Sequence, residues 1–183
     1  MVTEAGTGLY AFPFKPGQRV IELGGGDRPY VRPNVDVRAG LTVDIVANFE
    51  QALPIQTEEW DGIICQYALE HISYKKVRGF MAETFRILKP GGLAVFITAN
   101  LLEQCRQVVE TPPDRWNDDL PCMIFGSLDY EENSHRAGWS PEYAISCFQA
   151  IGYYEVKVLP HPACKTDMII EARKSAAEIT TSL

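Results

Sequence analysis

The stretch that decides the fold is Arg19-Val20-Ile21-Glu22-Leu23-Gly24-Gly25-Gly26. Its first five residues follow Pro16-Gly17 and form a compact apolar run, which is typical of a buried strand. Glycines directly after a strand permit a sharp turn and let a ligand lie against the backbone without a Cβ in the way. Three glycines alone are also compatible with an ordinary tight turn. The acid at Glu22, directly before them, favours a ligand that carries an ammonium group over a diphosphate.

Further short apolar runs alternate with helical patterns along the chain. The runs that predict strands are 35–37, 43–46, 62–65 and 93–98, followed by 154–159 and 168–172, which are expected to pair as an antiparallel end to the sheet. A first helix is predicted between Val77 and Leu88 and is ended by the Lys-Pro-Gly-Gly stretch 89–92. A second is predicted over 101–108. A third is predicted from Ser140 to Gly152, with Ile145, Phe148 and Ile151 facing inward. This alternation predicts a three-layer α/β domain, in which ligands bind at the carboxyl ends of the strands.

Composition and charge exclude several classes of protein. The 183 residues are 46% hydrophobic and 22% charged, which suits one globular domain and excludes a disordered chain. A net charge of −7 makes a nucleic-acid partner unlikely, because such proteins normally carry a basic surface. Five scattered cysteines indicate reduced thiols, with neither a disulfide framework nor a zinc site, and no metal is expected. Residues 1–8 lack the pattern of a signal peptide and no apolar run approaches about 18 residues, so we expect a soluble, cytoplasmic protein without a membrane span.

Five motifs in order give the chain a resemblance to the class I S-adenosylmethionine-dependent methyltransferases of the methyltransferase domain 11 type. They are Glu22-x-Gly24-x-Gly26, Asn34-Val35-Asp36, the stretch 43–54 from Val43 to Pro54, the stretch 60–71 from Trp60 to His71, and Leu88-Lys89-Pro90-Gly91-Gly92. The resemblance implies a Rossmann-like three-layer sandwich with a mostly parallel seven-stranded sheet and an antiparallel C-terminal hairpin. It predicts one methyltransferase domain over residues 1–174 and a flexible tail over 175–183.

The resemblance also implies a role for each matching residue, with S-adenosylmethionine as the cofactor. Glu22 would reach the amino group of the methionine moiety, directly or through water, while Gly24, Gly25 and Gly26 let that moiety pass close to the backbone. Asp36 would accept hydrogen bonds from the two ribose hydroxyls. The remaining expected contacts are Asn48 and the Phe49 amide at the adenine, and Gln66 and Tyr67 beside the sulfonium and the acceptor.

Two departures from the family pattern affect these expectations. Asn48 stands where an aspartate is common, so this contact to adenine carries no charge. Few residues separate Glu22 from Asp36, and Pro29 and Pro33 lie among them, so we expect a very short helix or a loop in place of the usual first helix.

The stretch 111–139 lacks regular periodicity but is rich in aromatic residues, and we interpret it as a cap over the acceptor site. Within it, His135 is a candidate general base, because imidazole titrates near neutral pH. The alternative for His135 is an ordinary surface histidine. His71 is a second candidate, although Glu70-His71 also suits the start of a helix in this family.

The leading functional hypothesis is methyl transfer to an oxygen or nitrogen of a small or carrier-linked acceptor, such as a saccharide or a lipid-linked sugar. The alternative is a cofactor-binding but catalytically inactive subunit that serves a partner. A nicotinamide-dependent dehydrogenase is disfavoured by Glu22 and Pro29, and nucleic-acid methylation by the charge. Both a monomer and a homodimer stay open.

Overall fold

The computed structural model describes residues 10–176, so most of the expected tail at 175–183 lies outside the described residues. The elements are β1 (Val20–Leu23), β2 (Asn34–Asp36), β3 (Ile45–Val46), β4 (Trp60–Gln66), α1 (Val77–Ile87), β5 (Leu88–Ala99), α2 (Leu101–Glu110), α3 (Asp119–Phe125), α4 (Pro141–Ile151), β6 (Tyr153–Pro160) and β7 (Asp167–Lys174). Within the described residues, no helix is long and apolar enough to span a membrane.

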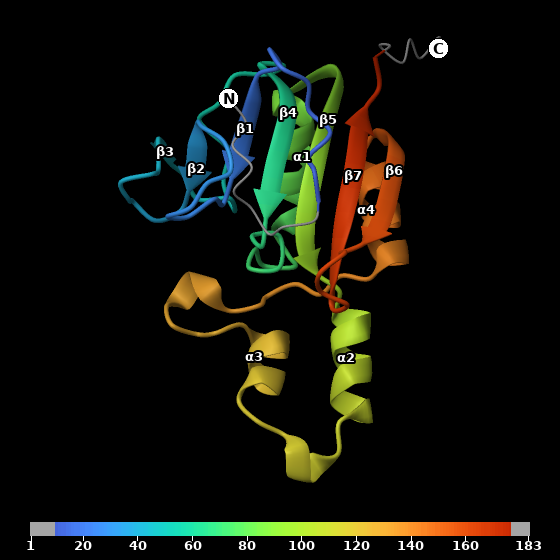
Figure 1. Cartoon of the computed structure of the whole chain (residues 1–183). Coiled ribbons are helices and arrows are strands. Elements are labelled where there is room, and N and C mark those ends of the chain that lie inside the picture. The colour runs from blue at the N-terminus through green and yellow to red at the C-terminus, as the bar shows by residue number, and fades with distance from the viewer. Residues whose placement is uncertain (1–9, 177–183) are drawn as a thin grey trace.

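Seven strands form one sheet in the order β3-β2-β1-β4-β5-β7-β6 (Figure 1). The pairs from β3 to β5 are parallel, whereas β7 runs antiparallel to both β5 and β6. The predicted α/β fold with a mostly parallel seven-stranded sheet and an antiparallel C-terminal hairpin is therefore confirmed. The strand order reverses between β1 and β4, which is where such sheets bind ligands.

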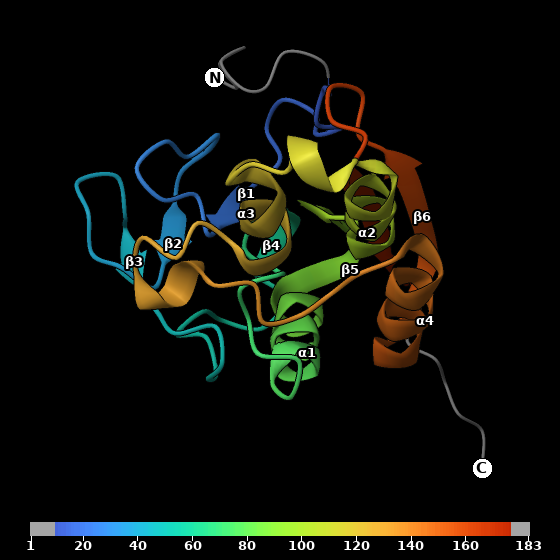
Figure 2. The same ribbon diagram turned by 90° about the horizontal axis from the view of Figure 1, so that it is seen from below.

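The two faces of the sheet are covered differently. Helices α1 and α4 lie together on one face, as Figures 1 and 2 both show, and bury Phe80 and Phe148 in the main core. On the other face, Tyr10, Phe12 and Phe14 pack against buried residues of β5 and β7. Among the described residues, the third layer is therefore an aromatic segment without helices, whose large side chains bury apolar surface of the sheet.

Several predicted boundaries shift by a few residues. Helix α1 ends at Ile87 and β5 begins at Leu88, which pairs with Trp60 of β4 before the register shifts and pairing resumes at Leu93. In α4 the buried residues are Ala144, Cys147 and Phe148, whereas Ile145 and Ile151, which were also predicted to face inward, are only partly buried. Ser140 caps this helix as predicted, since its hydroxyl accepts from the amide of Tyr143 at 3.3 Å. No helix intervenes between β1 and β2, as the short spacing predicted.

The stretch 111–139 leaves the carboxyl edge of the sheet and returns to it. It follows α2, makes a 3-10 turn at Pro113–Arg115, forms α3, and makes a second 3-10 turn at Glu131–Asn133. In Figure 1, α2 and α3 project below the sheet, and the chain after α3 runs back beneath the lower ends of β1, β2 and β4. The second half of the stretch is therefore the part that reaches the ligand-binding edge.

Candidate functional site

The turn after β1 brings the backbone close to neighbouring groups. Gly24 has φ +83°, and a Cβ there would lie 2.5 Å from the Cβ of Ala68. A Cβ on Gly25 would lie 2.7 Å from the side-chain oxygen of Asn34. Both positions therefore require glycine, because neighbouring side chains already occupy the space that a Cβ would take.

Asn34, at the start of β2, holds this turn in place. Its side chain accepts from the Gly25 amide at 3.0 Å and donates to the carbonyls of Gly26 and Thr42 at 3.0 and 3.1 Å. The residue is completely buried, so these bonds are shielded from water. This role was not predicted from the sequence, although a polar residue inside a short strand is a signal that could have revealed it.

Glu22 is buried inside the protein beside this turn. One carboxylate oxygen accepts from the amides of Tyr30 and Val31, the latter at 2.8 Å, and the other accepts from the Gln66 side chain at 3.3 Å. The residue is 1% exposed, and burial raises the pKa of its carboxyl above the ordinary value, against the lowering effect of these donors. Glu22 thus orders the loop before β2 and holds Gln66.

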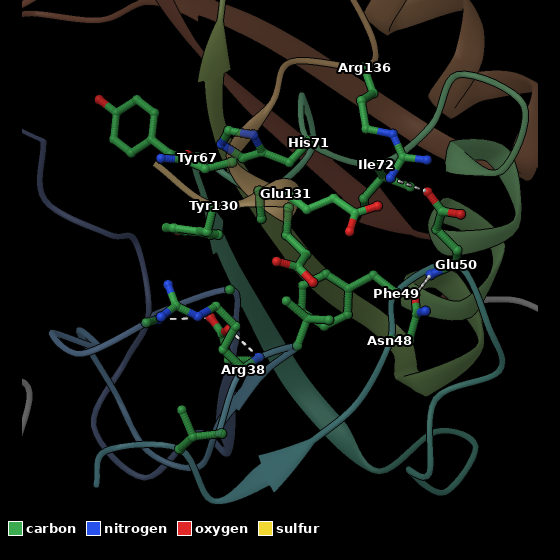
Figure 3. A pocket seen from close by; sticks show the side chains of 18 of the residues that line it. Arg38, Asn48, Phe49, Glu50, Tyr67, His71, Ile72, Tyr130, Glu131 and Arg136 are labelled. Carbon is green, nitrogen blue, oxygen red and sulfur yellow. Dashed lines mark hydrogen bonds and ion pairs between the residues drawn. The ribbon is translucent and has the colours of Figure 1, made fainter. Parts of the chain in front are cut away.

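A cavity of about 710 Å³ opens at the carboxyl edge of the sheet (Figure 3). Of the predicted site residues, Gly24, Gly26, Asp36, Asn48, Phe49, Tyr67 and His71 line it, whereas Glu22, Gly25, Gln66 and His135 do not. The lining residues not predicted as site residues include Arg38, Glu50, Tyr130, Glu131, Glu132 and Arg136. Glu50 lies within the 43–54 motif but was assigned no role there, and the others lie in loops or in the second 3-10 turn, where the sequence shows no recognisable motif.

Asp36 and Asn48 present polar atoms to this cavity from the ends of β2 and β3. The Asp36 carboxylate accepts from the amides of Gly26 and Arg38, each at 3.0 Å and each on a separate oxygen. The Asn48 side-chain oxygen accepts from the Glu50 amide at 2.8 Å. Each oxygen therefore keeps a further lone pair for a ligand.

Phe49 and Tyr67 form parts of the cavity wall. The Phe49 ring is 8% exposed and stacks on Phe80 with centroids 4.9 Å apart. Tyr67 adopts a left-handed backbone with φ +49°, and its hydroxyl donates to Asp167 at 3.0 Å. Burial and this carboxylate raise the pKa of the Tyr67 hydroxyl, so it stays protonated at neutral pH.

The two candidate histidines meet although they are far apart in sequence. Their ring centroids lie 5.0 Å apart, with His71 lining the main cavity and His135 lining a second cavity of about 350 Å³. His71 Nδ1 lies 3.2 Å from the Ser134 carbonyl oxygen. Burial lowers the pKa of both imidazoles, which are therefore neutral at pH 7 and able to accept a proton or bind a cation.

Glu70 lies beside this pair and was not predicted as a site residue. It is 2% exposed, and one carboxylate oxygen accepts from the Thr98 hydroxyl at 2.8 Å. Burial raises the pKa of its carboxyl to about 7. Its backbone carbonyl accepts from the amides of Arg136 and Ala137, which attaches the returning segment to the end of β4.

Known proteins that resemble this chain in sequence or fold are methyltransferases. A family model described as a methyltransferase domain matches residues 5–96, which is half of the chain. No curated protein sequence matches. The fold is similar to that of an S-adenosylmethionine-dependent methyltransferase from Archaeoglobus fulgidus, with 13% identity, 88% of each chain covered and a TM-score of 0.64. It is also similar to such a methyltransferase from Thermotoga maritima, with 17% identity, 88% of this chain and 84% of that chain covered, and a TM-score of 0.61. A third, from Mesorhizobium loti, has 15% identity, with 86% of this chain and 91% of that chain covered and a TM-score of 0.60.

The chain therefore belongs to the methyltransferase domain family, and its cofactor is S-adenosylmethionine. The residues present fit this group. Gly24 and Gly26 line the cavity, a Cβ on Gly26 would meet no atom within 4 Å, and Asp36 offers free lone pairs in the same cavity.

Proposed function

We propose that this protein transfers a methyl group from S-adenosylmethionine to an oxygen or nitrogen of a small or carrier-linked acceptor. The observation that carries the proposal is that Gly24, Asp36 and His71 line one continuous cavity, which joins the glycine turn to a candidate proton acceptor. S-adenosylmethionine, when bound, supplies a methyl group on a positively charged sulfur. The protein then has to position both reactants and exclude water.

We place the cofactor at the Asp36 side of the cavity. The free lone pairs of the Asp36 carboxylate suit the two ribose hydroxyls, and the remaining lone pair of the Asn48 oxygen suits the adenine amino group. Phe49 supplies an apolar wall and its backbone amide. Glu22, which is buried against backbone amides, acts as a positioning residue that keeps the loop before β2 in shape.

The acceptor belongs at the opposite side, between His71 and the segment 130–136. The side chains there are mostly polar and include Glu131, Glu132, Asn133 and Arg136, which can hydrogen-bond to hydroxyl groups. Two carboxylates disfavour a polyanionic acceptor. A saccharide or a lipid-linked sugar is the acceptor class that this lining fits best.

His71 is the proposed general base for the acceptor hydroxyl. When its Nδ1 donates to the Ser134 carbonyl, its Nε2 keeps a lone pair. Because burial lowers the pKa of His71, this lone pair is free at neutral pH. His135, 5.0 Å away between ring centroids, is the second proton-accepting group of the pair.

The test combines calorimetry and a methylation assay. We expect the full chain to bind S-adenosylmethionine and its demethylated product, and to methylate at least one hydroxyl or amine acceptor from a panel of saccharides and carrier-linked sugars. His71→Asn should lower turnover by about 100-fold or more without changing cofactor affinity. The control, His161→Asn, removes an imidazole that lines neither cavity and should leave turnover unchanged. Absence of cofactor binding overturns the proposal, and binding without methylation of any acceptor supports an inactive subunit instead.

A further inference from the structure

One cluster of potential metal ligands stands out among the described residues. Glu70, His71 and His135 each place one ligand atom so that all three lie within 4.8 Å of one another. Glu70 and His71 follow β4, whereas His135 arrives from the chain after α3. The cluster lies where the main cavity and the second cavity approach each other, because His71 lines the first and His135 the second.

Each member of the cluster is oriented by a second group. His71 Nδ1 lies 3.2 Å from the Ser134 carbonyl, and the His135 ring interacts with the carbonyls of Met123 and Ile124. The Glu70 carboxylate accepts from the Thr98 hydroxyl at 2.8 Å. Metal-binding histidines and carboxylates are typically held in this way, by hydrogen bonds from the atoms that do not bind the metal.

The Glu70 carboxyl group also has no cationic partner in the described part of the chain. The carboxylate is 2% exposed, and no lysine or arginine within residues 10–176 forms an ion pair with it. A buried carboxylate is costly unless a positive charge compensates it. A divalent cation bound between Glu70, His71 and His135 would provide that compensation and stabilise the carboxylate form of Glu70.

We propose that Glu70, His71 and His135 bind a divalent transition-metal ion. Two imidazole nitrogens and one carboxylate oxygen are ligands that zinc and its first-row neighbours accept, and three protein ligands leave a position open toward the cavity. Bonds of about 2.0–2.2 Å place ligand atoms roughly 3.5 Å apart, so binding draws the three groups together by about an ångström.

The binding of the ion stands independently, but its contribution to methyl transfer rests on the proposed function. A bound ion would occupy the imidazole lone pairs that otherwise accept a proton. It would instead lower the pKa of an acceptor hydroxyl that occupies the open position, so that the hydroxyl is deprotonated by metal binding and not by a histidine.

The experiment must separate this cluster from the thiols. Cys105 and Cys122 are exposed and free, and thiolates also bind such ions. Cobalt(II) distinguishes the two, because thiolate ligands give an intense near-ultraviolet charge-transfer band that nitrogen and oxygen ligands lack. We would treat the full chain with a chelator, titrate it with cobalt(II) while recording absorbance, and then displace the cobalt with zinc.

We expect one equivalent of cobalt with visible bands of nitrogen and oxygen ligation and no thiolate band. Glu70→Gln and His135→Asn should each weaken binding by at least tenfold, while Cys105→Ser/Cys122→Ser should bind as the unmodified chain does. Circular dichroism shows whether each variant folds. If Glu70→Gln does not fold, His135→Asn, which lies in an irregular segment, still tests the site. A thiolate band, no stoichiometric binding, or unchanged affinity in both ligand variants overturns the site. Calorimetry with S-adenosylmethionine on the same samples tests the proposed function separately, since it does not depend on cobalt.

Discussion

The guanidinium carbon of Arg38 lies 4.0 Å from the centroid of the Tyr130 ring, which connects the loop after β2 to the segment that returns from α3 (Figure 3). A second contact, between Arg136 and Glu50 at 3.1 Å, connects the same segment to the loop after β3. All four residues line the main cavity. These two contacts hold the returning segment across the proposed cofactor and acceptor sites.

Tyr130→Ala should weaken the binding of S-adenosylmethionine about two- to fivefold, because an exposed cation–π contact contributes about 0.5–1 kcal/mol to holding the segment in place. Isothermal titration calorimetry measures the effect. Tyr154→Ala, which removes an exposed tyrosine from β6, is the matched control and should bind normally. An equal loss in both variants would show that the Arg38 contact is not responsible.

Asp36→Asn should lower cofactor affinity by about tenfold or more. The substitution removes a charged acceptor from the cavity, and hydrogen bonds to a charged group contribute about 1.5–3 kcal/mol. Glu155→Gln makes the same change in net charge on β6, away from the cavity, and should have no effect. Calorimetry measures the affinity of the unmodified chain and of both variants for S-adenosylmethionine. Unchanged affinity in Asp36→Asn would show that this residue does not belong to the cofactor site.

Two alanine substitutions in the glycine turn should lower the free energy of unfolding by different amounts. Gly24→Ala combines a positive φ with a Cβ only 2.5 Å from Ala68, so we expect a loss of about 2–4 kcal/mol. Gly26→Ala has φ +51° and meets nothing within 4 Å, so only the backbone cost of about 1–2 kcal/mol applies. Urea unfolding followed by circular dichroism measures both. Equal losses would contradict the close approach of Ala68.

Glu22 should make stability depend on pH. Burial raises the pKa of Glu22 in the folded protein, so its contribution to stability is present below the ordinary value of 4.5 and is lost as the pH rises through the raised value. The neighbouring Cys65 remains neutral throughout, because burial raises the pKa of its thiol.

Glu22→Gln removes this titration while keeping an oxygen for the amides of Tyr30 and Val31. The free energy of unfolding, measured between pH 4 and 8, should therefore fall with rising pH more in the unmodified chain than in the variant. Parallel profiles would mean that the carboxyl of Glu22 is not desolvated in the folded protein.

The sequence predicted most of the fold because its signals are local. Apolar runs, the glycines after β1 and the serine–proline start of α4 each act within a few residues, so strands and helices could be located with small errors at their ends. The end of α1 was less well placed, because Lys89-Pro90-Gly91-Gly92 signals a helix stop but cannot show that the chain continues as a strand paired with β4.

Most of the predicted residues that line the cavity lie at or just after the carboxyl end of a strand. Gly24, Asp36 and Asn48 reach the cavity because parallel strands end at one edge of the sheet. Glu22 lies within β1, and its side chain accepts hydrogen bonds from the amides of Tyr30 and Val31, which no local pattern indicates.

By itself, the sequence determined the order of strands and helices, the glycine turn and the family, since these follow from residues close together along the chain. The tertiary structure alone decided that Arg38 meets Tyr130 and that His135 joins Glu70 and His71. The physical reason is that the stretch 111–139 has no periodic pattern, so its path depends on contacts such as the Arg136 and Ala137 amides with the Glu70 carbonyl. Those contacts exist only once the sheet has formed and the end of β4 is in place.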